Sequence, residues 1–286
     1  MSVEAWGMMG AGIAALVAGL VLVRARFRTA CGLGRILVLG PVFEAVPLAM
    51  FAAEHFTAAH DLMAIVPRWL PGPLFWTYFV GVALLAAAIS FIAWRHVRWS
   101  AALLALLFLI IVATVDLPNL SAGAHDRFFW ILTVRETSFA GGAMVLAGSV
   151  WPGRAGNALI RLGRGIVALV MIFYAIEHFL FPRNVPGVPL EKLTPAWIPG
   201  PVVIAFVVGI ALLVAGFGLF FRRTVRIAAA GCGVILLLLT AFFYVPIFAT
   251  EIHSPLAVEG LNYIGDTLLF AATVLLAGLG TDRPTA

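Results

Sequence analysis

Five stretches of 17 to 24 residues in this 286-residue chain contain no charged side chain. A helix needs about 20 apolar residues to cross the hydrocarbon core of a bilayer, so each stretch is long enough to span a membrane. Transmembrane β-strands would instead alternate apolar and polar residues over about 10 positions, and these runs do not alternate. The charge-free stretches are Ala5–Val23, Leu74–Trp94, Trp99–Val115, Pro201–Phe221 and Ile227–Thr250.

Four further stretches have a similar length but contain acidic residues. They are Ile36–Phe56 with Glu44 and Glu54, Phe128–Val150 with Glu136, Gly165–Phe181 with Glu177, and Leu261–Gly280 with Asp266. Only 11% of all residues are charged, against about 25% in an ordinary soluble domain. This composition excludes a soluble globule, a disordered chain and a disulfide-stapled secreted module. We therefore predict an all-α polytopic membrane protein with nine transmembrane helices.

The arginine residues predict the orientation of these helices. They cluster in the loops after the first, third, fifth and seventh expected helices, so the pI of 9.9 does not indicate nucleic-acid binding. Short basic loops lie in the cytoplasm, so we expect an outside N-terminus and a cytoplasmic C-terminus in the inner membrane of a bacterium. The first helix has no basic residue before it, unlike a cleaved signal peptide. Of the 13 acidic residues only Asp282 falls on the cytoplasmic side, which places any chemistry near the outer face.

The chain contains an internal duplication. Ala53–Phe56 (AEHF) recurs as Ile176–Phe179 (IEHF), and Pro67–Pro73 (PRWLPGP) recurs as Pro195–Pro201 (PAWIPGP). Further matches are His125 with His253, Pro118 with Pro246, and Glu136–Thr137 with Asp266–Thr267. Each unit has four helices, an even number, so both units should share one orientation, related by an axis along the membrane normal. The predicted parts are an N-terminal helix with its basic loop (1–35), a first four-helix repeat (36–150) and a second (151–286).

A four-helix unit with Glu-His-Phe at the outer end of its first helix, followed by a loop with Trp and Pro-Gly-Pro, resembles the DoxX-like integral membrane proteins. The resemblance covers nearly the whole chain as two tandem copies. It implies a redox-associated protein: a quinone-reactive or accessory subunit of a respiratory-type oxidoreductase, with a quinone as ligand and a redox subunit as partner. Two other functions stay open, as does the question of enzymatic activity: a carrier or channel for a small solute or metal ion, and a membrane scaffold or assembly factor.

The dithiol that redox-associated relatives of this family use is missing here. Cys31 and Cys232 lie 201 residues apart and form no Cys-x-x-Cys pair. We expect both to be small, buried, apolar residues.

The polar residues that recur in both units form the candidate site. A carboxylate inside a membrane helix is unfavourable unless it is paired, so these positions suggest function. The two sets are Glu54, His55, His125 and Glu136 in the first unit, and Glu177, His178, His253 and Asp266 in the second. We expect each unit to bring its own set together near the outer leaflet.

Three interpretations of the two sets stay open. The first is a structural one, in which carboxylate and imidazole hydrogen-bond each other and pin the outer loop. The second is a divalent-metal site with His55, His125, His178 and His253 as candidate ligands. The third is a site for a quinone head group or a small polar ligand.

Glu44 lies 11 residues before His55, so it returns to the same face of the helix about 16 Å deeper in the membrane. The second unit has no acid at the matching position, near Val167. Glu44 is therefore a candidate for a polar pathway, with an interhelical hydrogen bond as the alternative.

Arg135 is adjacent to Glu136, whereas the neighbour of Asp266 is the neutral Gly265. The arginine is placed to neutralise Glu136 or Glu54. We therefore expect Asp266 to be the less compensated acid and a candidate for binding a proton in a proton-linked step.

The Pro-x-Trp-x-Pro-Gly-Pro loops are expected to fold back as rigid caps, because proline presets turns and cannot continue a helix. Trp69 and Trp197 would anchor these caps at the lipid–water interface. The alternative is that both rings stack on a flat ligand such as a quinone. Gly141 and Gly142, inside the fifth expected helix, favour close helix packing.

Overall fold

The computed structural model describes residues 1–281, in which the regular structure is helical apart from one isolated bridge between Asn184 and Leu193. The first unit and the helix before it contain α1 (Val3–Leu22), α2 (Arg24–Thr29), α3 (Gly34–Leu37), α4 (Gly40–Thr57), α5 (Ala59–Leu62), the 3-10 turn η1 (Met63–Ile65), α6 (Pro73–Ala93), α7 (Val97–Ile111), the π-helical turn η2 (Val112–Asp116), α8 (Leu117–Ala122) and α9 (Arg127–Val150). The second unit contains α10 (Gly153–Leu180), α11 (Pro201–Leu219), α12 (Val225–Leu239), the π-helical turn η3 (Thr240–Tyr244), α13 (Val245–Glu251) and α14 (Ala257–Ala277).

Eight helical rods within residues 1–281 are long and apolar enough to cross a membrane. The ninth rod is α9, which is also 24 residues long but carries Arg135 and Glu136. Charge is tolerated there because α9 packs against α7, α10 and α14 inside the bundle. The predicted fold class, an all-α polytopic membrane protein, is confirmed.

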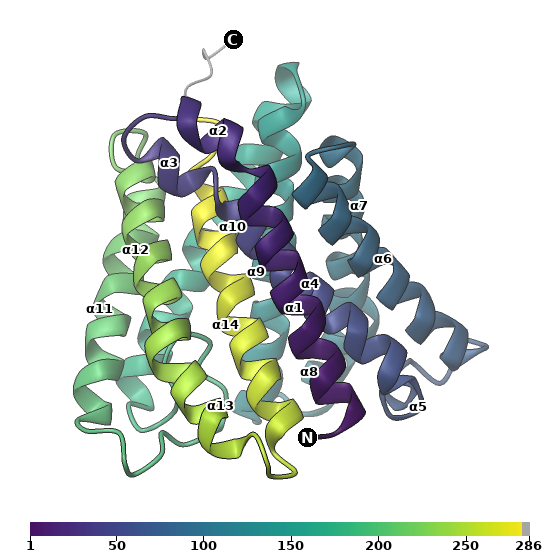
Figure 1. Cartoon of the computed structure of the whole chain (residues 1–286). Coiled ribbons are helices and arrows are strands. Elements are labelled where there is room, and N and C mark those ends of the chain that lie inside the picture. The colour runs from purple at the N-terminus through teal and green to yellow at the C-terminus, as the bar shows by residue number, and fades with distance from the viewer. Residues whose placement is uncertain (282–286) are drawn as a thin grey trace.

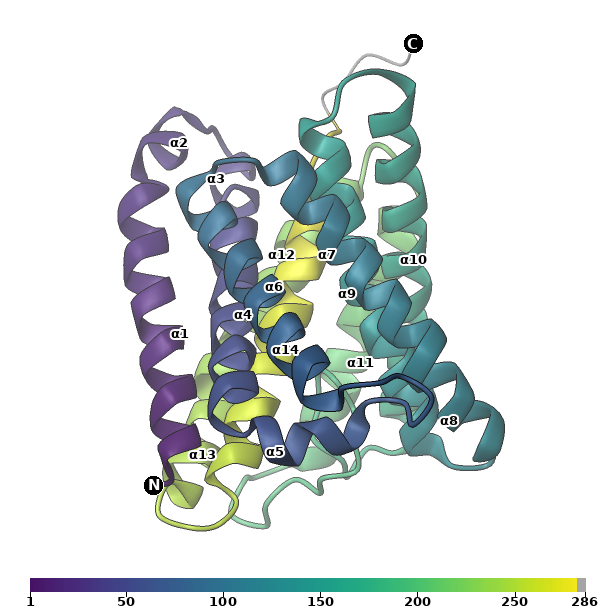
Figure 2. The ribbon, with the colours of Figure 1, turned by 90° about the vertical axis from the view of Figure 1, so that its right-hand side faces the viewer.

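The two four-helix units have the same internal packing. In the first, α4 packs on α6, α6 on α7, and α7 on α9; in the second, α10, α11, α12 and α14 repeat this order. The units also exchange partners, because α4 contacts α14 while α10 contacts α9, and α9 and α14 contact each other. A two-fold pseudo-axis between α9 and α14 explains these contacts. Figures 1 and 2 show α14 inside the bundle and α1 outside, against α4.

Each unit contains one widened turn before a proline. The turn η2 precedes Pro118 and η3 precedes Pro246, at an offset of 128 residues. Proline has no N–H, and its ring displaces the carbonyl one turn earlier, which disturbs the helix at that point. The two π-helical turns are therefore part of the internal duplication, and the residues that follow them lie at equivalent positions in the two units.

Glycines allow the closest helix contacts. A Cβ atom at Gly163 of α10 would lie 2.3 Å from the carbonyl oxygen of Gly141 on α9, and one at Gly142 would lie 3.0 Å from Thr273 on α14. A side chain at Gly163 would collide with the α9 backbone, and one at Gly142 would force Thr273 to move. The prediction that Gly141 and Gly142 serve helix packing is confirmed.

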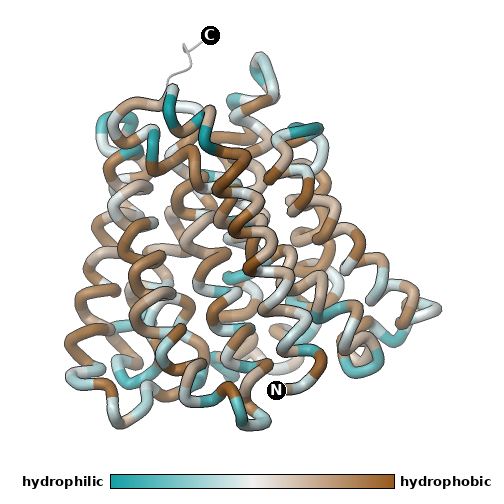
Figure 3. Tube along the Cα trace, viewed as in Figure 1, coloured by the Kyte–Doolittle hydropathy of each residue, from teal (hydrophilic) through white to brown (hydrophobic). Residues whose placement is uncertain are grey.

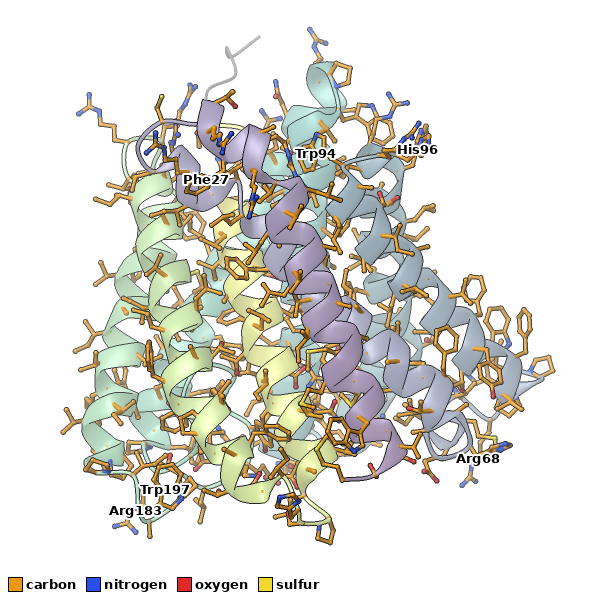
Figure 4. The ribbon with its side chains drawn as sticks, in the orientation of Figure 1. Phe27, Arg68, Trp94, His96, Arg183 and Trp197 are labelled. Carbon is orange, nitrogen blue, oxygen red and sulfur yellow. The ribbon has the colours of Figure 1, made fainter. Side chains whose placement is uncertain are left out.

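The molecule has two polar ends and an apolar middle, as Figure 3 shows. Figure 4 labels Trp94 and His96 at one end, which we call the basic end because the arginine-rich loops lie there. Arg68, Arg183 and Trp197 lie at the other, which we call the acidic end. The expected position of Asp282 and of the C-terminus falls outside the described residues.

Two sequence expectations about the basic end are corrected. The sixth rod begins at Gly153 and not near Gly165, because its arginine-containing first turns continue the helix beyond the apolar stretch. Arg164, at the end of this added part of the helix, donates from its guanidinium to the carbonyl oxygens of Ala277 and Leu279 at the end of α14. Cys31 is exposed, contrary to expectation, whereas Cys232 is buried.

Candidate functional site

A buried ion network joins the two units at the pseudo-axis. Arg135 on α9 donates from Nη1 to Oδ2 of Asp266 on α14 at 2.6 Å, and from Nη2 to Oε1 of Glu136 at 2.9 Å. The expectation that Asp266 lacks a compensating cation is therefore wrong. Its arginine comes from the other unit, and no inspection of its own neighbour Gly265 could show that.

A difference in side-chain volume explains why the arginine occurs in one unit only. The ring of Phe51 fills the space beside Gly265, where a Cβ atom would lie 2.8 Å from the Phe51 ring. At the matching place in the other unit the pair is Tyr174 and Arg135, and the Tyr174 hydroxyl donates to the carbonyl oxygen of Ile131 at 3.4 Å. One half of the interface is thus filled by an apolar ring beside a glycine, and the other by a tyrosine beside an arginine.

Glu54 also links the two units. Its Oε1 accepts a hydrogen bond from Nδ2 of Asn262 on α14 at 2.9 Å, and Arg135 is close enough to act on it electrostatically. We expected Glu54 to meet His125 or Glu136 of its own unit. The structure assembles the buried acids across the units instead, because the first helix of each unit packs on the last helix of the other.

In the second unit, a loop segment fills the space between these acids and the acidic end of the molecule. Residues Val185–Leu190, which we call the plug, are all buried. Both ring nitrogens of His178 are hydrogen-bonded: Nδ1 donates to the Tyr174 carbonyl oxygen at 2.5 Å, and Nε2 accepts from the Gly187 N–H at 2.8 Å. The Tyr244 hydroxyl donates to the Pro186 carbonyl oxygen at 2.5 Å. One peptide group, Pro186–Gly187, is therefore held from both sides.

Two cations secure the plug. Arg127 at the start of α9 pairs with Glu177 at 2.5 Å and donates a second bond to the Pro189 carbonyl oxygen. Lys192 pairs with Glu251 at 2.8 Å and with Glu259 at 3.2 Å. Glu177 and His178 thus both hold the outer loop, as the structural interpretation expects, but each does so through other partners and not through a hydrogen bond to the other.

The first unit has the same framework without a plug. His55 Nδ1 lies 2.8 Å from the Phe51 carbonyl oxygen, which repeats the bond of His178. Among the described residues, Nε2 of His55 has no hydrogen-bond partner. Asp116 replaces Tyr244 at the end of the π-helical turn. It is 8% exposed, and its buried Oδ2 atom has no hydrogen-bond partner in the described part of the chain.

The histidines before the last helices do not join these groups. His125 and His253 are both exposed at the acidic end, so the expectation that they complete a set in each unit is wrong. Within residues 1–281, no three His, Cys, Asp or Glu side chains are arranged to hold a metal ion. Trp69 and Trp197 are 68% and 54% exposed on their loops, in line with a position at the membrane surface.

Glu44 is fully buried, and neither of its carboxyl oxygens has a hydrogen-bond partner within residues 1–281. Gly40 packs on Leu275 and Leu276 of α14, and Phe51 packs on Gly265. Glu44 follows Gly40 by one helical turn, so it faces α14 between these contacts. The prediction that Glu44 points into the bundle agrees with this position.

Buried oxygens without a hydrogen-bond partner among the described residues also lie on α14. One of them is Oγ1 of Thr273, which packs against Gly142. We call the polar groups along α4, α9 and α14 the polar seam; they are Glu54, Asn262, Arg135, Glu136, Asp266, Thr273 and Glu44.

Several residues of the site are not predicted from the sequence. They are Asp116, Arg127, Tyr174, Tyr244, Lys192 and Asn262. One signal was available, because Asp116 and Tyr244 both stand two positions before the matched prolines. A second was the change in offset from 123 at Glu-His to 128 at the Trp loop, which reveals five extra residues in the second loop.

Comparison with known proteins adds one finding. A family described only as a domain of unknown function, DUF8561, matches residues 44–124, which is less than a third of the chain. The matched segment begins at Glu44 and ends just after α8, so it contains His55 and Asp116. No curated protein and no solved structure matches the chain.

Proposed function

We propose that this protein is a proton-linked carrier of a small polar solute, with the polar seam as its path. The observation that carries the proposal is Glu44, a carboxyl group that is fully buried between the two units with both oxygens unpartnered. Structural acids in membrane helices are paired, as Asp266 is by Arg135. Glu44 is not, so a packing role does not account for it.

The surroundings of Glu44 favour one protonation state in this conformation. An ionised carboxylate without a partner is very unfavourable in an apolar interior, so Glu44 is stable there with its proton bound. Ionisation requires water or a cation, and the seam must open to admit either. Proton release is therefore coupled to rearrangement of the two units, as alternating access demands.

The ion network supplies a candidate outer gate. Arg135, Glu136 and Asp266 lie on the two helices that meet at the pseudo-axis, on the acidic-end side of Thr273. Relative movement of the units would break the bond between Arg135 and Asp266 while leaving the one to Glu136, which lies on the same helix. Such a paired charge can exchange partners without ever being left alone in the membrane.

Reconstituted protein tests this function. A panel of organic amines, organic acids, amino acids and sugars is applied to proteoliposomes on a solid-supported membrane, with and without a pH gradient. We expect one solute class to give a current driven by the gradient. Glu44→Gln should abolish gradient-driven uptake but retain exchange of labelled for unlabelled solute, while Glu191→Gln, an exposed control, behaves as the wild type.

Gradient-driven uptake by Glu44→Gln at the wild-type rate would contradict the proposal. So would the absence of a gradient-driven current for every solute class in the panel.

A redox-associated function, as implied by the resemblance to DoxX-like proteins, is the second candidate. The two exposed loop tryptophans support it, because Trp69 and Trp197 are accessible to a lipid-soluble quinone at the membrane surface. Extraction of quinone from protein purified with native lipid, compared between wild type and the Trp69→Ala, Trp197→Ala double variant, tests it. Equal quinone content in both would count against this function, and co-purification of a redox subunit would support it.

A further inference from the structure

The two units use equivalent positions differently at their acidic ends. In the second unit, His178 and Tyr244 hold the Pro186–Gly187 peptide group between α10 and the end of η3. His178 accepts the N–H, and Tyr244 donates to the carbonyl oxygen. The plug is thus a built-in occupant of a site with one acceptor and one donor.

The first unit has the same positions but no such occupant. His55 matches His178, and Asp116 matches Tyr244, at offsets of 123 and 128. The loop from His55 to Trp69 covers 14 positions (69 − 55), whereas the loop from His178 to Trp197 covers 19 (197 − 178). The shorter loop lacks the length of the plug. No hydrogen bond from residues 57–72 reaches the His55 ring or Asp116 in the described structure.

The course of the two loops agrees with this difference. In Figure 1 the corner between α5 and α6 projects to the side of the bundle. The loop that follows α10 instead runs across the acidic end of the bundle, at the bottom of the view. Residues 185–190 are all buried, but of residues 58–66 only Ala59 is. The first loop therefore does not enter its own unit as the second does.

The hydrogen-bonding groups of His55 and Asp116 determine which kind of molecule fits between them in the first unit. The Nδ1 atom of His55 uses its hydrogen on the Phe51 carbonyl oxygen, so Nε2 is left as an acceptor. When it is ionised, Asp116 puts a carboxylate where the second unit has a hydroxyl donor, and a cationic occupant is the partner that would keep it ionised. Glu136 and Arg135 are close enough to act on Asp116 electrostatically. With Asp116 ionised by a cationic occupant, both groups that would meet the occupant are acceptors.

The charge balance points the same way. The network contains one cation, Arg135, and its two bonds go to Glu136 and Asp266. Asp116 therefore has no cation of its own in the described residues. A metal ion is disfavoured, since no three ligating side chains converge there. An ammonium group supplies a positive charge and several N–H donors at once.

We propose that the first unit binds a small organic molecule carrying a protonated amine, held between Nε2 of His55 and the carboxylate of Asp116. The site takes the place that the plug occupies in the second unit. As the substrate site of the carrier, this assignment rests on the proposed function. Binding itself does not depend on transport.

Calorimetry on the full chain in nanodiscs tests the site, with propylammonium chloride as probe. Sodium chloride at equal ionic strength and neutral propionamide serve as controls. We expect saturable binding of propylammonium only. Asp116→Asn should weaken it about tenfold or more, because a hydrogen bond to a charged group is lost. Glu191→Gln, an exposed acid of the second unit's loop, should leave the affinity unchanged.

A second variant guards against simple misfolding. Asp116→Tyr introduces the residue of the second unit, whose hydroxyl donates to a carbonyl oxygen. This variant should lose propylammonium binding and gain binding of propionamide. A folded protein with exchanged preference is a result that a damaged site would not give.

The proposal is overturned if wild type does not bind propylammonium, if propionamide or sodium binds equally well, or if Asp116→Asn binds as the wild type does. These outcomes differ from failure of the carrier function. Binding with the expected variants but without flux in proteoliposomes would leave the site standing and remove the carrier. Gradient-driven flux of another solute class without amine binding would do the reverse.

Discussion

Replacing Arg135 by glutamine removes the one cation from the network at the pseudo-axis. The side chains of Arg135 and Asp266 are only 18% and 8% exposed, so water replaces the lost partner poorly. Removing one member of a buried ion pair costs about 3–5 kcal/mol, because the other charge stays buried. Two carboxylates, Asp266 and Glu136, lose their cation in this variant. We therefore expect the free energy of unfolding to fall by an amount within that range.

Replacing Asp266, the other member of the pair, should lower the free energy of unfolding by less. Asp266→Asn keeps an oxygen that accepts from Arg135, and Glu136 still balances the arginine. We expect a loss of about 1–2 kcal/mol, typical of a weakened buried hydrogen bond. In the double variant the two losses should fail to add by at least about 1 kcal/mol, because both act on one contact.

Steric trapping in bicelles measures the free energy of unfolding of these variants without leaving the lipid phase. Arg223→Gln, an exposed arginine at the basic end, is the matched control and should change it by less than about 0.5 kcal/mol. Losses that add within about 0.5 kcal/mol would refute the reasoning, because they would mean that Arg135 and Asp266 are energetically independent.

Three further outcomes are expected. Gly163→Ala should lose about 1–3 kcal/mol of unfolding free energy by overpacking against the α9 backbone, whereas Gly165→Ala, which has open space at its Cβ, should lose none; equal losses would contradict this. Gly187→Ala should raise hydrogen exchange throughout the plug, because φ is +103° there and its Cβ would press on α12; unchanged exchange would show that the plug tolerates a side chain. An impermeant maleimide should label the exposed Cys31 only from the cytoplasm, and Ser2→Cys only from outside; labelling of both from one side would contradict the topology.

The helices could be predicted from the sequence because membrane spans are local. About 20 apolar residues define each span, and the duplicated prolines and loops define the units. The boundary of α10 could not be predicted so well. Its first turns carry arginines, and a long arginine side chain reaches polar groups while its helix continues, as Arg164 does at the end of α14.

The site was predictable by residue type but not by partner. Glu54 recurs as Glu177, and Glu136 recurs as Asp266, which identified these positions as buried polar groups. Glu54 and Asp266 nevertheless pair across the units: Glu54 with Asn262, and Asp266 with Arg135. Such pairing depends on which helices meet at the pseudo-axis, and a hydropathy pattern does not contain that information. His125 resembled a ligand only because it recurs; its exposed loop position is set by where α8 ends.

The central claim is that Glu44 holds a proton between the two units and releases it when the seam opens. Infrared difference spectroscopy tests this directly, because the carbonyl band of a protonated carboxylic acid is distinct from the bands of a carboxylate. We predict that adding a transported solute to wild type removes a protonated-carboxyl band that shifts in heavy water. Glu44→Gln should lack this band while still binding the solute. The same band change in Glu44→Gln, or none in a wild type that binds solute, would contradict the account.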